Sequence, residues 1–385
     1  MSIPLAQHRT KRIGRAVAVA SIALLALSGC TANTTSNPAG GDAQGDASST
    51  RTIIDHTGEE IEIPAEIDRV AVDQIPIAST YTAFFEGEAP YLVGMSQAVV
   101  DSLEGTVAAD IAPELLEVET GYYDNGELNV ESLLELDPDV VLYNASNAEH
   151  GELFEKAGIP AVGFKTQGDP AVTYTEWLRL LEDVFDEDGK MDEVIEYGAG
   201  IIADAREKNA QIPEADRKDV LEITGYKPGT LTVQGEPEFF GTFWLDTANA
   251  DNAAIGAQQP LSEVSSEQLL QWDPDVILLS GYGHSGLLPE DVLGGLEGVD
   301  LSTMTAVQEG EVLSTRLGWW NWFTPNPDAP LVAHWIGAAV YPELADPEAL
   351  DQLTREYYLE VYGYELSDEQ LEHMYAGSYS AEVDR

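Results

Sequence analysis

The stretch that decides the fold is NVESLLELDPDVVL at residues 129–142, because it returns as SSEQLLQWDPDVIL at residues 265–278. Each copy has the pattern of a short amphipathic helix that ends at Asp-Pro and is followed by a strand of aliphatic residues. Proline cannot continue a helix and disfavours helical backbone in the residue before it, so extended backbone is predicted at Asp137 and Asp273. Two copies this far apart do not make a solenoid, which needs more repeats at a shorter period. The duplication therefore predicts two similar α/β lobes that face each other across a cleft.

The composition fits two folded domains and excludes one class of partner. The chain has 385 residues, of which 44% are hydrophobic, so it can fill two cores. Its 18 basic and 69 acidic residues give a formal net charge of -51. Nucleic acid is excluded as a partner, because phosphate binding depends on clusters of lysine and arginine. We interpret the acidity as a solvation shell, for solubility or for work at high salt, since charge spread over every segment steers a cationic ligand poorly.

The N-terminus has the pattern of a secretory signal peptide over residues 1–29, in which a basic segment precedes the apolar run at 16–29. That run is too short for a membrane span. It ends in LSGC at 27–30, which resembles the bacterial lipobox, where the cysteine becomes the lipidated first residue of the mature protein. Cys30 is the only cysteine in the chain, so lipidation explains it better than a disulfide or a buried structural role. Residues 30–51 comprise this cysteine and a flexible tether with few apolar side chains.

The rest of the sequence divides into two lobes and a connection. In residues 52–170, a hairpin that turns at Thr57-Gly58 precedes strands that alternate with helices, the pattern of a mostly parallel sheet covered on both faces. Residues 171–212 have apolar residues at helical spacing with a break near Gly189, and are predicted to be a connecting helix. Residues 213–385 return to strands and end in terminal helices. The predicted fold is α/β, with two similar lobes whose mostly parallel sheets face a cleft and which a long helix joins.

Candidate ligand-binding residues come directly after the predicted strands, because ligands of α/β lobes bind beyond the carboxyl ends of the strands. Three tryptophans fall in GWWNWF at 318–323, and so many adjacent aromatics cannot all face one core. Basic residues are scarce, so Arg316 and Lys227 are the predicted contacts to ligand oxygen atoms. A loop packed by its own aromatics is the alternative for the tryptophans, and a core position is the alternative for Phe239. The full predicted set of ligand contacts is Tyr143, Tyr226, Lys227, Phe239, Tyr282, Arg316, Trp319, Trp320 and Trp322.

The sequence does not have the motifs of an enzyme or of a free-metal site. It contains no GxSxG nucleophile elbow, no P-loop, no HExxH pair and no GxGxxG that opens a helix, so no catalytic residue is predicted. The histidines lack HxH and HxxxH spacing, so no metal ligand and no cofactor are predicted. The weaker alternatives for contact with a haem iron are His284, Tyr122, Tyr123 and Tyr226. An α/β enzyme on the same scaffold and an aromatic-rich glycan binder are the alternatives from other classes of protein.

Residues 52–377 resemble the substrate-binding lipoproteins of ABC importers, above all the subgroup that takes up ferric siderophores, haem and cobalamin. The resemblance is carried by the two repeat units, by TIIDHTGEEIEIPAEIDRVAV at 52–72, and by PLVAHWIGAAVYPE at 330–343 followed by REYYLEVYGYELSDEQ at 355–370. It implies two α/β lobes, joined by a rigid helix, that open and close only slightly.

The resemblance also implies partners. One exposed glutamate on each lobe of such proteins pairs with arginines of the permease dimer, and the matching residues are Glu131 and Glu267. Equivalent carboxylates on two copies of one unit suit a two-fold partner, while support of a helix start is the alternative role. The implied protein is anchored through Cys30 at the extracytoplasmic face of the cell membrane and delivers an iron chelate to the permease and its ATPase. Because only two cations are candidates, a ferric hydroxamate siderophore is favoured over a triply anionic catecholate, with haem or a corrinoid as alternatives.

Overall fold

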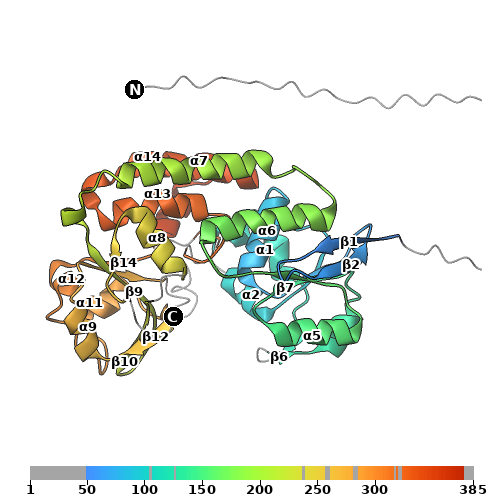
Figure 1. The fold of residues 1–385 in the computed structure, drawn as a ribbon, viewed down its shortest axis with the longest axis horizontal. Helices are drawn as coiled ribbons and strands as arrows, with labels where there is room; N and C mark the ends of the chain where they lie inside the picture. The colour runs from blue at the N-terminus through green and yellow to red at the C-terminus, as the bar shows by residue number, and fades with distance from the viewer. Residues whose placement is uncertain are drawn as a thin grey trace, which may run out of the picture. The chain divides into compact units, whose positions relative to one another are not determined.

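The structure is a computed structural model that describes most of the chain from residue 49 onward (Figure 1). All of the described residues belong to one compact unit, Ser48–Arg385. None of the helices that these residues form is long and apolar enough to cross a membrane. The described ranges are 49–103, 106–124, 127–235, 239–255, 261–280, 285–315, 318–319 and 323–376.

The N-terminal lobe is built on a four-stranded parallel sheet in the order β4-β3-β7-β8. Its central strands are short aliphatic runs buried on both faces, as expected for a parallel sheet between helices. Val72 and Leu142 face the large core that includes α1 and α6, while Val141 faces a smaller cluster with Phe154 of α5. The predicted hairpin is β1–β2, with Gly58 at φ 85° in its turn. The elements are β1 (Thr50–Ile54), β2 (Glu60–Pro64), β3 (Val70–Val72), α1 (Ile75–Phe84), β4 (Leu92–Met95), α2 (Gln97–Leu103), α3 (Val107–Ile111), a 3-10 turn (Pro113–Glu117), β5 (Tyr123–Asp124), β6 (Glu127–Leu128), α4 (Val130–Glu135), β7 (Val140–Asn144), α5 (Ala148–Ala157) and β8 (Ala161–Phe164).

The C-terminal lobe repeats this plan with one difference. Strands β9, β13 and β14 are parallel, and β11 pairs in parallel with β9, so the sheet is mostly parallel as predicted. It also has an antiparallel part, in which β10 pairs with β9 and β12. The antiparallel part arises because β9 turns directly into β10 through Gly229 at φ 88°, and a tight turn joins only antiparallel strands. The elements are a 3-10 turn (Glu214–Asp216), β9 (Asp219–Lys227), β10 (Thr230–Gln234), α8 (Phe240–Ala248), β11 (Asp251–Asn252), β12 (Leu261–Val264), α9 (Ser266–Trp272), β13 (Val276–Leu279), α11 (Pro289–Gly294), α12 (Thr305–Glu309) and β14 (Val312–Ser314).

The connection between the lobes consists of two helices, α6 (Pro170–Phe185) and α7 (Asp192–Asn209). The chain leaves α6 through Asp186 at φ 55° and passes Gly189 at φ 78°, so the break predicted near Gly189 is confirmed and a single continuous helix is not formed. Helix α6 packs on α1, with the rings of Phe185 and Phe84 5.6 Å apart between centroids. Helix α7 packs on α8 and on the terminal helix α13 (Ala329–Val340). The connection is therefore jointed, with one helix on each lobe (Figure 1).

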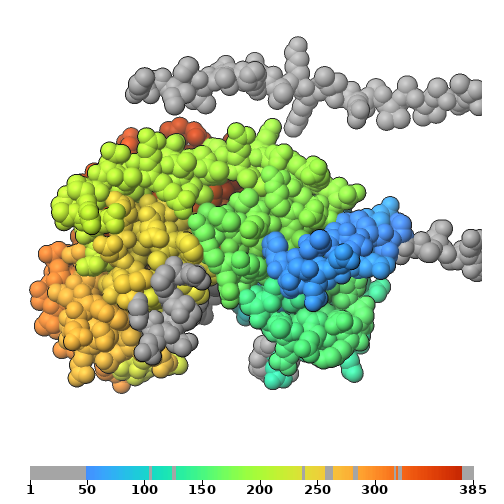
Figure 2. Space-filling view, in the orientation of Figure 1, coloured from blue at the N-terminus to red at the C-terminus, as the bar shows by residue number. Residues whose placement is uncertain are grey.

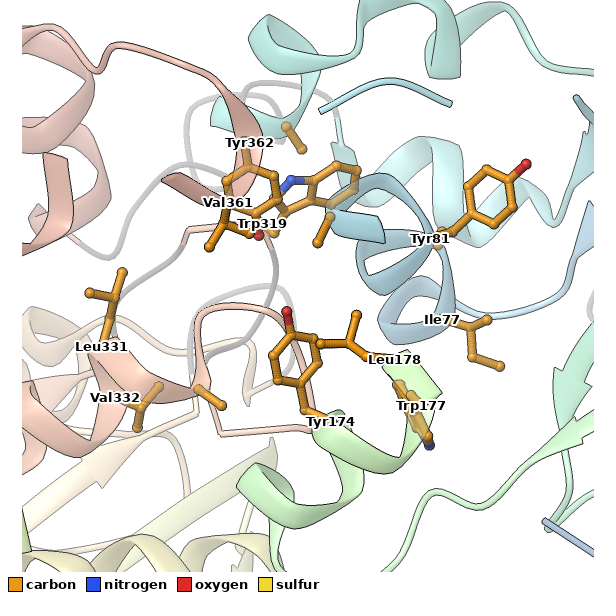
Figure 3. Packing of buried hydrophobic residues seen from close by; sticks show 14 of the residues in the cluster. Ile77, Tyr81, Tyr174, Trp177, Leu178, Trp319, Leu331, Val332, Val361 and Tyr362 are labelled. Carbon is orange, nitrogen blue, oxygen red and sulfur yellow. The ribbon is translucent and has the colours of Figure 1, made fainter. Parts of the chain in front are cut away.

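The last helices pack on both lobes. After α13 and a 3-10 turn (Pro342–Leu344) come α14 (Pro347–Tyr362) and α15 (Asp368–Ala376). Helix α14 contacts α1, and Gln370 Nε2 of α15 donates a 2.6 Å hydrogen bond to Asp110 Oδ2 of α3. Figure 3 shows Trp319 and Tyr362 in one core with residues of α1, α6 and α13. The segment from α14 onward thus contacts the N-terminal lobe in addition to α13.

The two repeat units have the same local structure. The side chain of Asn129 caps α4 and that of Ser265 caps α9, each by accepting a hydrogen bond from the backbone N–H three residues on. The carboxylate of Asp139 accepts hydrogen bonds of 2.8 and 2.9 Å from two backbone N–H groups just before β3. The carboxylate of Asp275 accepts one of 2.9 Å from the first N–H of β9. Each unit therefore fastens its own strand to the start of the neighbouring strand.

The prediction of extended backbone at Asp137 and Asp273 is wrong. Both residues are left-handed, with φ of 46° and 40°. Their N–H groups donate 3.1 Å hydrogen bonds to the carbonyls of Leu134 and Leu269, which closes each helix in a left-handed cap. Aspartate tolerates this backbone better than most residues, and the helix-closing bond outweighs the bias from the following proline.

Candidate ligand-binding site

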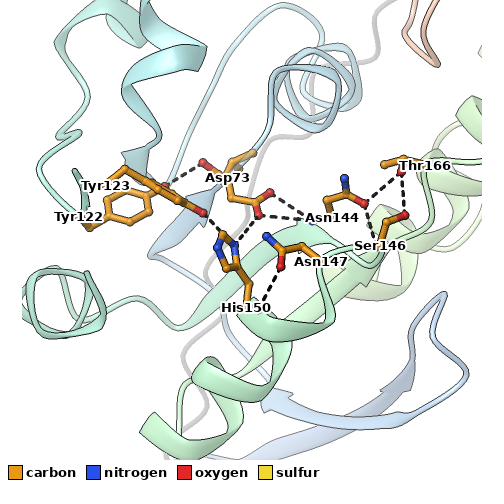
Figure 4. A network of polar contacts seen from close by, with 9 residues as sticks. Asp73, Tyr122, Tyr123, Asn144, Ser146, Asn147, His150 and Thr166 are labelled. Carbon is orange, nitrogen blue, oxygen red and sulfur yellow. Dashed lines mark hydrogen bonds and ion pairs between the residues drawn. The ribbon is translucent and has the colours of Figure 1, made fainter. Parts of the chain in front are cut away.

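Polar side chains gather where the parallel strands of the N-terminal lobe end. Asp73 follows β3, Asn144 ends β7 and Thr166 follows β8. Asn144 N donates to Asp73 Oδ1 at 3.2 Å, and Asn144 Oδ1 accepts from the Thr166 hydroxyl at 3.0 Å. The hydroxyls of Ser146 and Thr166 lie 3.2 Å apart. Because parallel strands end at one edge of a sheet, residues far apart in sequence meet here as one network, which we call the edge network (Figure 4).

Two further side chains join the edge network from other elements. His150 lies in the first turn of α5, with Nδ1 3.8 Å from Asp73 Oδ2, and the Tyr123 hydroxyl of β5 lies 3.4 Å from the same nitrogen. Burial raises the pKa of the Asp73 carboxyl above its ordinary value, and the hydrogen bond and charge of His150 partly offset that rise. Burial also raises the pKa of the Tyr123 hydroxyl, and the nearby Asp73 carboxylate adds to this effect. The edge network thus holds one buried carboxyl beneath neutral hydroxyl, amide and phenol groups.

Several buried polar atoms in and after the strands of the C-terminal lobe have no hydrogen-bond partner among the described residues. Ser314 Oγ, Thr315 Oγ1 and Trp319 Nε1 are buried and have no hydrogen-bond partner among the described residues. Glu222 of β9 is 1% exposed and has no partner at either carboxylate oxygen within the described part of the chain. Burial raises the pKa of Glu222 well above its ordinary value. Figure 2 shows the surface hollowed between the part coloured green and cyan and the part coloured yellow and orange.

The predicted ligand contacts that the structure describes lie at separate places. Tyr143 packs on Phe154 and lines a pocket of about 550 Å³ between α5 and the β1–β2 hairpin, which the edge network does not line. The Tyr226 hydroxyl donates to the Glu297 carbonyl at 3.1 Å, and Lys227 pairs with Glu263 at 3.4 Å, both beside the β9–β10 turn.

The remaining predicted contacts are aromatic or lie outside the described residues. Trp319 is fully buried, and its ring stacks on Tyr362 with the centroids 6.5 Å apart, so it offers no surface to a ligand. Phe239 is half-buried at the start of α8, with its ring 4.8 Å from that of Phe240. Four predicted contacts and the lipidation site lie outside the described residues, namely Arg316, Trp320, Trp322, Tyr282 and Cys30.

Sequence reasoning missed the centre of the edge network. The run RVAVDQI at 69–75 reads as one strand in the sequence and includes Asp73, whereas β3 ends at Val72 and leaves Asp73 directly after it. His150 lacks any metal-ligand spacing and looks like a lone surface histidine in the sequence. No group of three or more His, Cys, Asp or Glu side chains suited to a metal ion occurs among the described residues. The pairing of His150 with Asp73 depends on how α5 returns over the sheet, which no local pattern encodes.

The predicted docking residues are both accessible. Glu131 lies in the first turn of α4 and Glu267 in the first turn of α9, and both side chains are exposed. GYGHSG at 281–286 does have the GxGxxG spacing after β13, but its first four residues lie outside the described part of the chain.

Comparisons with known proteins define the family. The family model described as periplasmic binding protein matches residues 76–316, so the chain belongs to this family. The molybdate-binding protein MolA of Haemophilus influenzae is 26% identical over 334 residues, which cover 81% of this chain and 91% of MolA. A periplasmic solute binding protein from Veillonella parvula has a similar structure, with 27% identity, a TM-score of 0.74, and coverage of 88% of this chain and 100% of that one. Helicobacter pylori CeuE with nickel and histidine is 20% identical, with a TM-score of 0.66 and coverage of 84% and 98%.

The fold and the family together give the general role. Two α/β lobes with parallel strands, joined through helices, are the architecture of these solved binding proteins. The protein is accordingly the substrate-binding component of an ABC importer and belongs to an extracytoplasmic family.

Proposed function

We propose that the ligand is a ferric siderophore of the hydroxamate type, bound at the edge network and passed to the permease dimer and its ATPase. The observation that supports this most is the chemistry of the edge network. Asn144, Ser146 and Thr166 offer neutral amide and hydroxyl groups to ligand oxygen atoms. Lys227, one of the two cations predicted to contact the ligand, pairs with Glu263 instead. A chelate of low net charge suits such a site better than a triply anionic catecholate, and haem or a corrinoid would compete on the same grounds.

Molybdate is a second candidate, because the relative MolA is named as molybdate-binding. Hydroxyl and amide donors also suit a tetrahedral oxyanion. Asp73 separates the two candidates, since a carboxylate in the network repels a dianion and has little effect on a complex of low charge. The variant Asp73→Asn should raise the affinity for molybdate severalfold if molybdate is the ligand, and should leave the affinity for a ferric hydroxamate nearly unchanged.

A ligand panel tests the proposal. The purified protein is titrated with ferrioxamine B, sodium molybdate, haemin, cyanocobalamin and nickel with histidine, read by tryptophan fluorescence and by calorimetry. We expect saturable binding of ferrioxamine B with a dissociation constant in the micromolar range or below, and none of the iron-free hydroxamate at that concentration. If the protein binds molybdate and does not bind ferrioxamine B, the assigned ligand changes from a siderophore to an oxyanion. If no compound of the panel binds, both candidates are refuted.

We propose the following for the cellular setting. Lipidation of Cys30 holds the protein at the extracytoplasmic face of the membrane, with residues 30–51 as the tether. Glu131 and Glu267 pair with arginines of the two permease subunits. Both carboxylates are exposed and occupy the same position of duplicated units, which supports this role. The protein itself performs no catalysis in this scheme.

A further inference from the structure

The two repeat units expose an apolar side chain at the same position. Leu133 of α4 and Leu269 of α9 are fully buried and fix each short helix to its lobe. The next residue in each unit points the other way, since Leu134 is 48% exposed and Leu270 is 38% exposed. Single exposed leucines are ordinary on protein surfaces. The two exposed leucines, however, occupy equivalent positions of the two repeat units. A partner with two-fold symmetry would contact both of them in the same way.

Each exposed leucine is paired with a predicted docking carboxylate. Glu131 and Leu134 are three residues apart on α4, and Glu267 and Leu270 are three residues apart on α9, so each pair shares one face of its helix. In Figure 1, α9 and the β6 strand that leads into α4 lie at the ends of their lobes away from α7, α13 and α14. Side-chain caps and left-handed closures hold both helices in the same local form.

We propose that Leu134 and Leu270 are a matched pair of apolar anchors, each of which fills a recess on one subunit of the two-fold permease dimer beside the basic group that receives Glu131 or Glu267. This inference rests on the proposed docking role of the two glutamates. The carboxylates speed and orient the encounter, while the leucines become desolvated at the centre of each contact and slow dissociation. Each permease subunit therefore presents one cationic side chain next to one apolar pocket, and a two-fold axis relates the two subunits.

Site-specific crosslinking tests the surface without knowledge of the ligand. A benzophenone amino acid replaces Leu134, Leu270 or, as the matched control, Leu359, which is 51% exposed on α14. The three variants are irradiated in the cells that make the protein, and the crosslinked partner is identified by mass spectrometry. We expect positions 134 and 270 to crosslink to a membrane-embedded subunit of an ABC importer and position 359 not to do so. A crosslink from only one repeat, an equal yield at 359, or capture of a second copy of this chain would overturn the proposal.

Substitutions measure the strength of the anchors. Leu134→Gln and Leu270→Gln should each weaken binding to the reconstituted importer at least tenfold and leave the melting temperature and the ligand panel unchanged, with Leu359→Gln as the neutral control. Leu134→Met and Leu270→Met should restore binding, because they keep the apolar volume. If the crosslinks succeed while no ligand of the panel binds, the ligand assignment fails and the docking surface stands. If ligands bind while Leu134→Gln and Leu270→Gln dock normally, the anchors fail and the ligand assignment stands.

Discussion

Gly241 lies directly against the carboxyl group of Glu222, because a Cβ on Gly241 would be 1.7 Å from Glu222 Oε2. The first turn of α8 therefore closes over a buried carboxyl that has no hydrogen-bond partner within the described residues. Gly241 N donates to Gln234 Oε1 at 3.0 Å, which holds the turn in place. The glycine is needed here for space and not for an unusual backbone conformation.

The close approach predicts that Gly241→Ala destabilises the protein. The added methyl group would meet a carboxyl that is enclosed on all sides, so overpacking should lower the free energy of unfolding by about 1–3 kcal/mol. Gly200→Ala in α7 is the matched control, because a Cβ there has no heavy atom within 4 Å, and this helical substitution should stabilise by about 0.5–1 kcal/mol. Urea unfolding of both variants checks the pair. Equal effects of the two substitutions would contradict the packing described here.

The buried Glu222 predicts a pH dependence of stability. Burial raises the pKa of Glu222 well above its ordinary value of 4.5, so the folded state binds the proton more tightly than the unfolded state. The contribution of this group to stability is complete below about pH 4.5 and is lost as the pH rises toward the folded-state pKa, by up to about 1.4 kcal/mol per pH unit. Glu222→Gln should be as stable as the parent in acid and more stable at neutral pH. Parallel profiles of melting temperature against pH would refute this.

The edge network predicts a loss of ligand affinity in Thr166→Val. This change keeps the shape of the side chain and removes the hydroxyl that bonds to Asn144, so it should weaken binding by about five- to tenfold. Thr50→Val is the control, since it removes an exposed hydroxyl of β1 that bonds to Glu62 outside the network. Calorimetry with the ligand that the panel identifies checks both. Unchanged affinity in Thr166→Val would place the ligand elsewhere.

Lipidation at the lone cysteine predicts that Cys30→Ser releases the protein from membranes. Without the thiol no acyl chain can be attached, and the apolar surface that holds the protein in the bilayer is lost. Fractionation of cells should find the parent protein in the membrane and the variant in the medium or in the soluble extracytoplasmic fraction. A variant that stays with the membrane after a salt wash would show that another contact anchors it.

The parts of the fold that the sequence predicts are those set by local pattern. The run VVLYN at 140–144 became a buried strand, and the segment around Trp177 with apolar residues at helical spacing became a helix packed on the core. The repeat unit predicted equivalent elements in both lobes, and the structure confirms them at α4–β7 and α9–β13.

The parts that the sequence did not predict depend on contacts between distant residues. Asp73 and His150 meet only after two strands have paired and α5 has packed over them. The amphipathic pattern of a helix such as α14 shows that one of its faces is buried. It does not show which lobe that face packs against. The prediction of extended backbone at Asp137 failed for another reason. A hydrogen bond to the carbonyl of Leu134 outweighs the local preference of a residue before proline for extended backbone.

The placement of the last two helices has a consequence for the order in which the molecule becomes complete. The N-terminal lobe takes part of its support from α14 and α15, which come after both lobes in the sequence. A growing chain therefore holds an N-terminal lobe with its α1 and α3 surfaces uncovered until α14 and α15 have been added. A variant that lacks α14 and α15 should therefore have a loosened N-terminal lobe. Limited proteolysis should detect this as faster cleavage near residues 87 and 110.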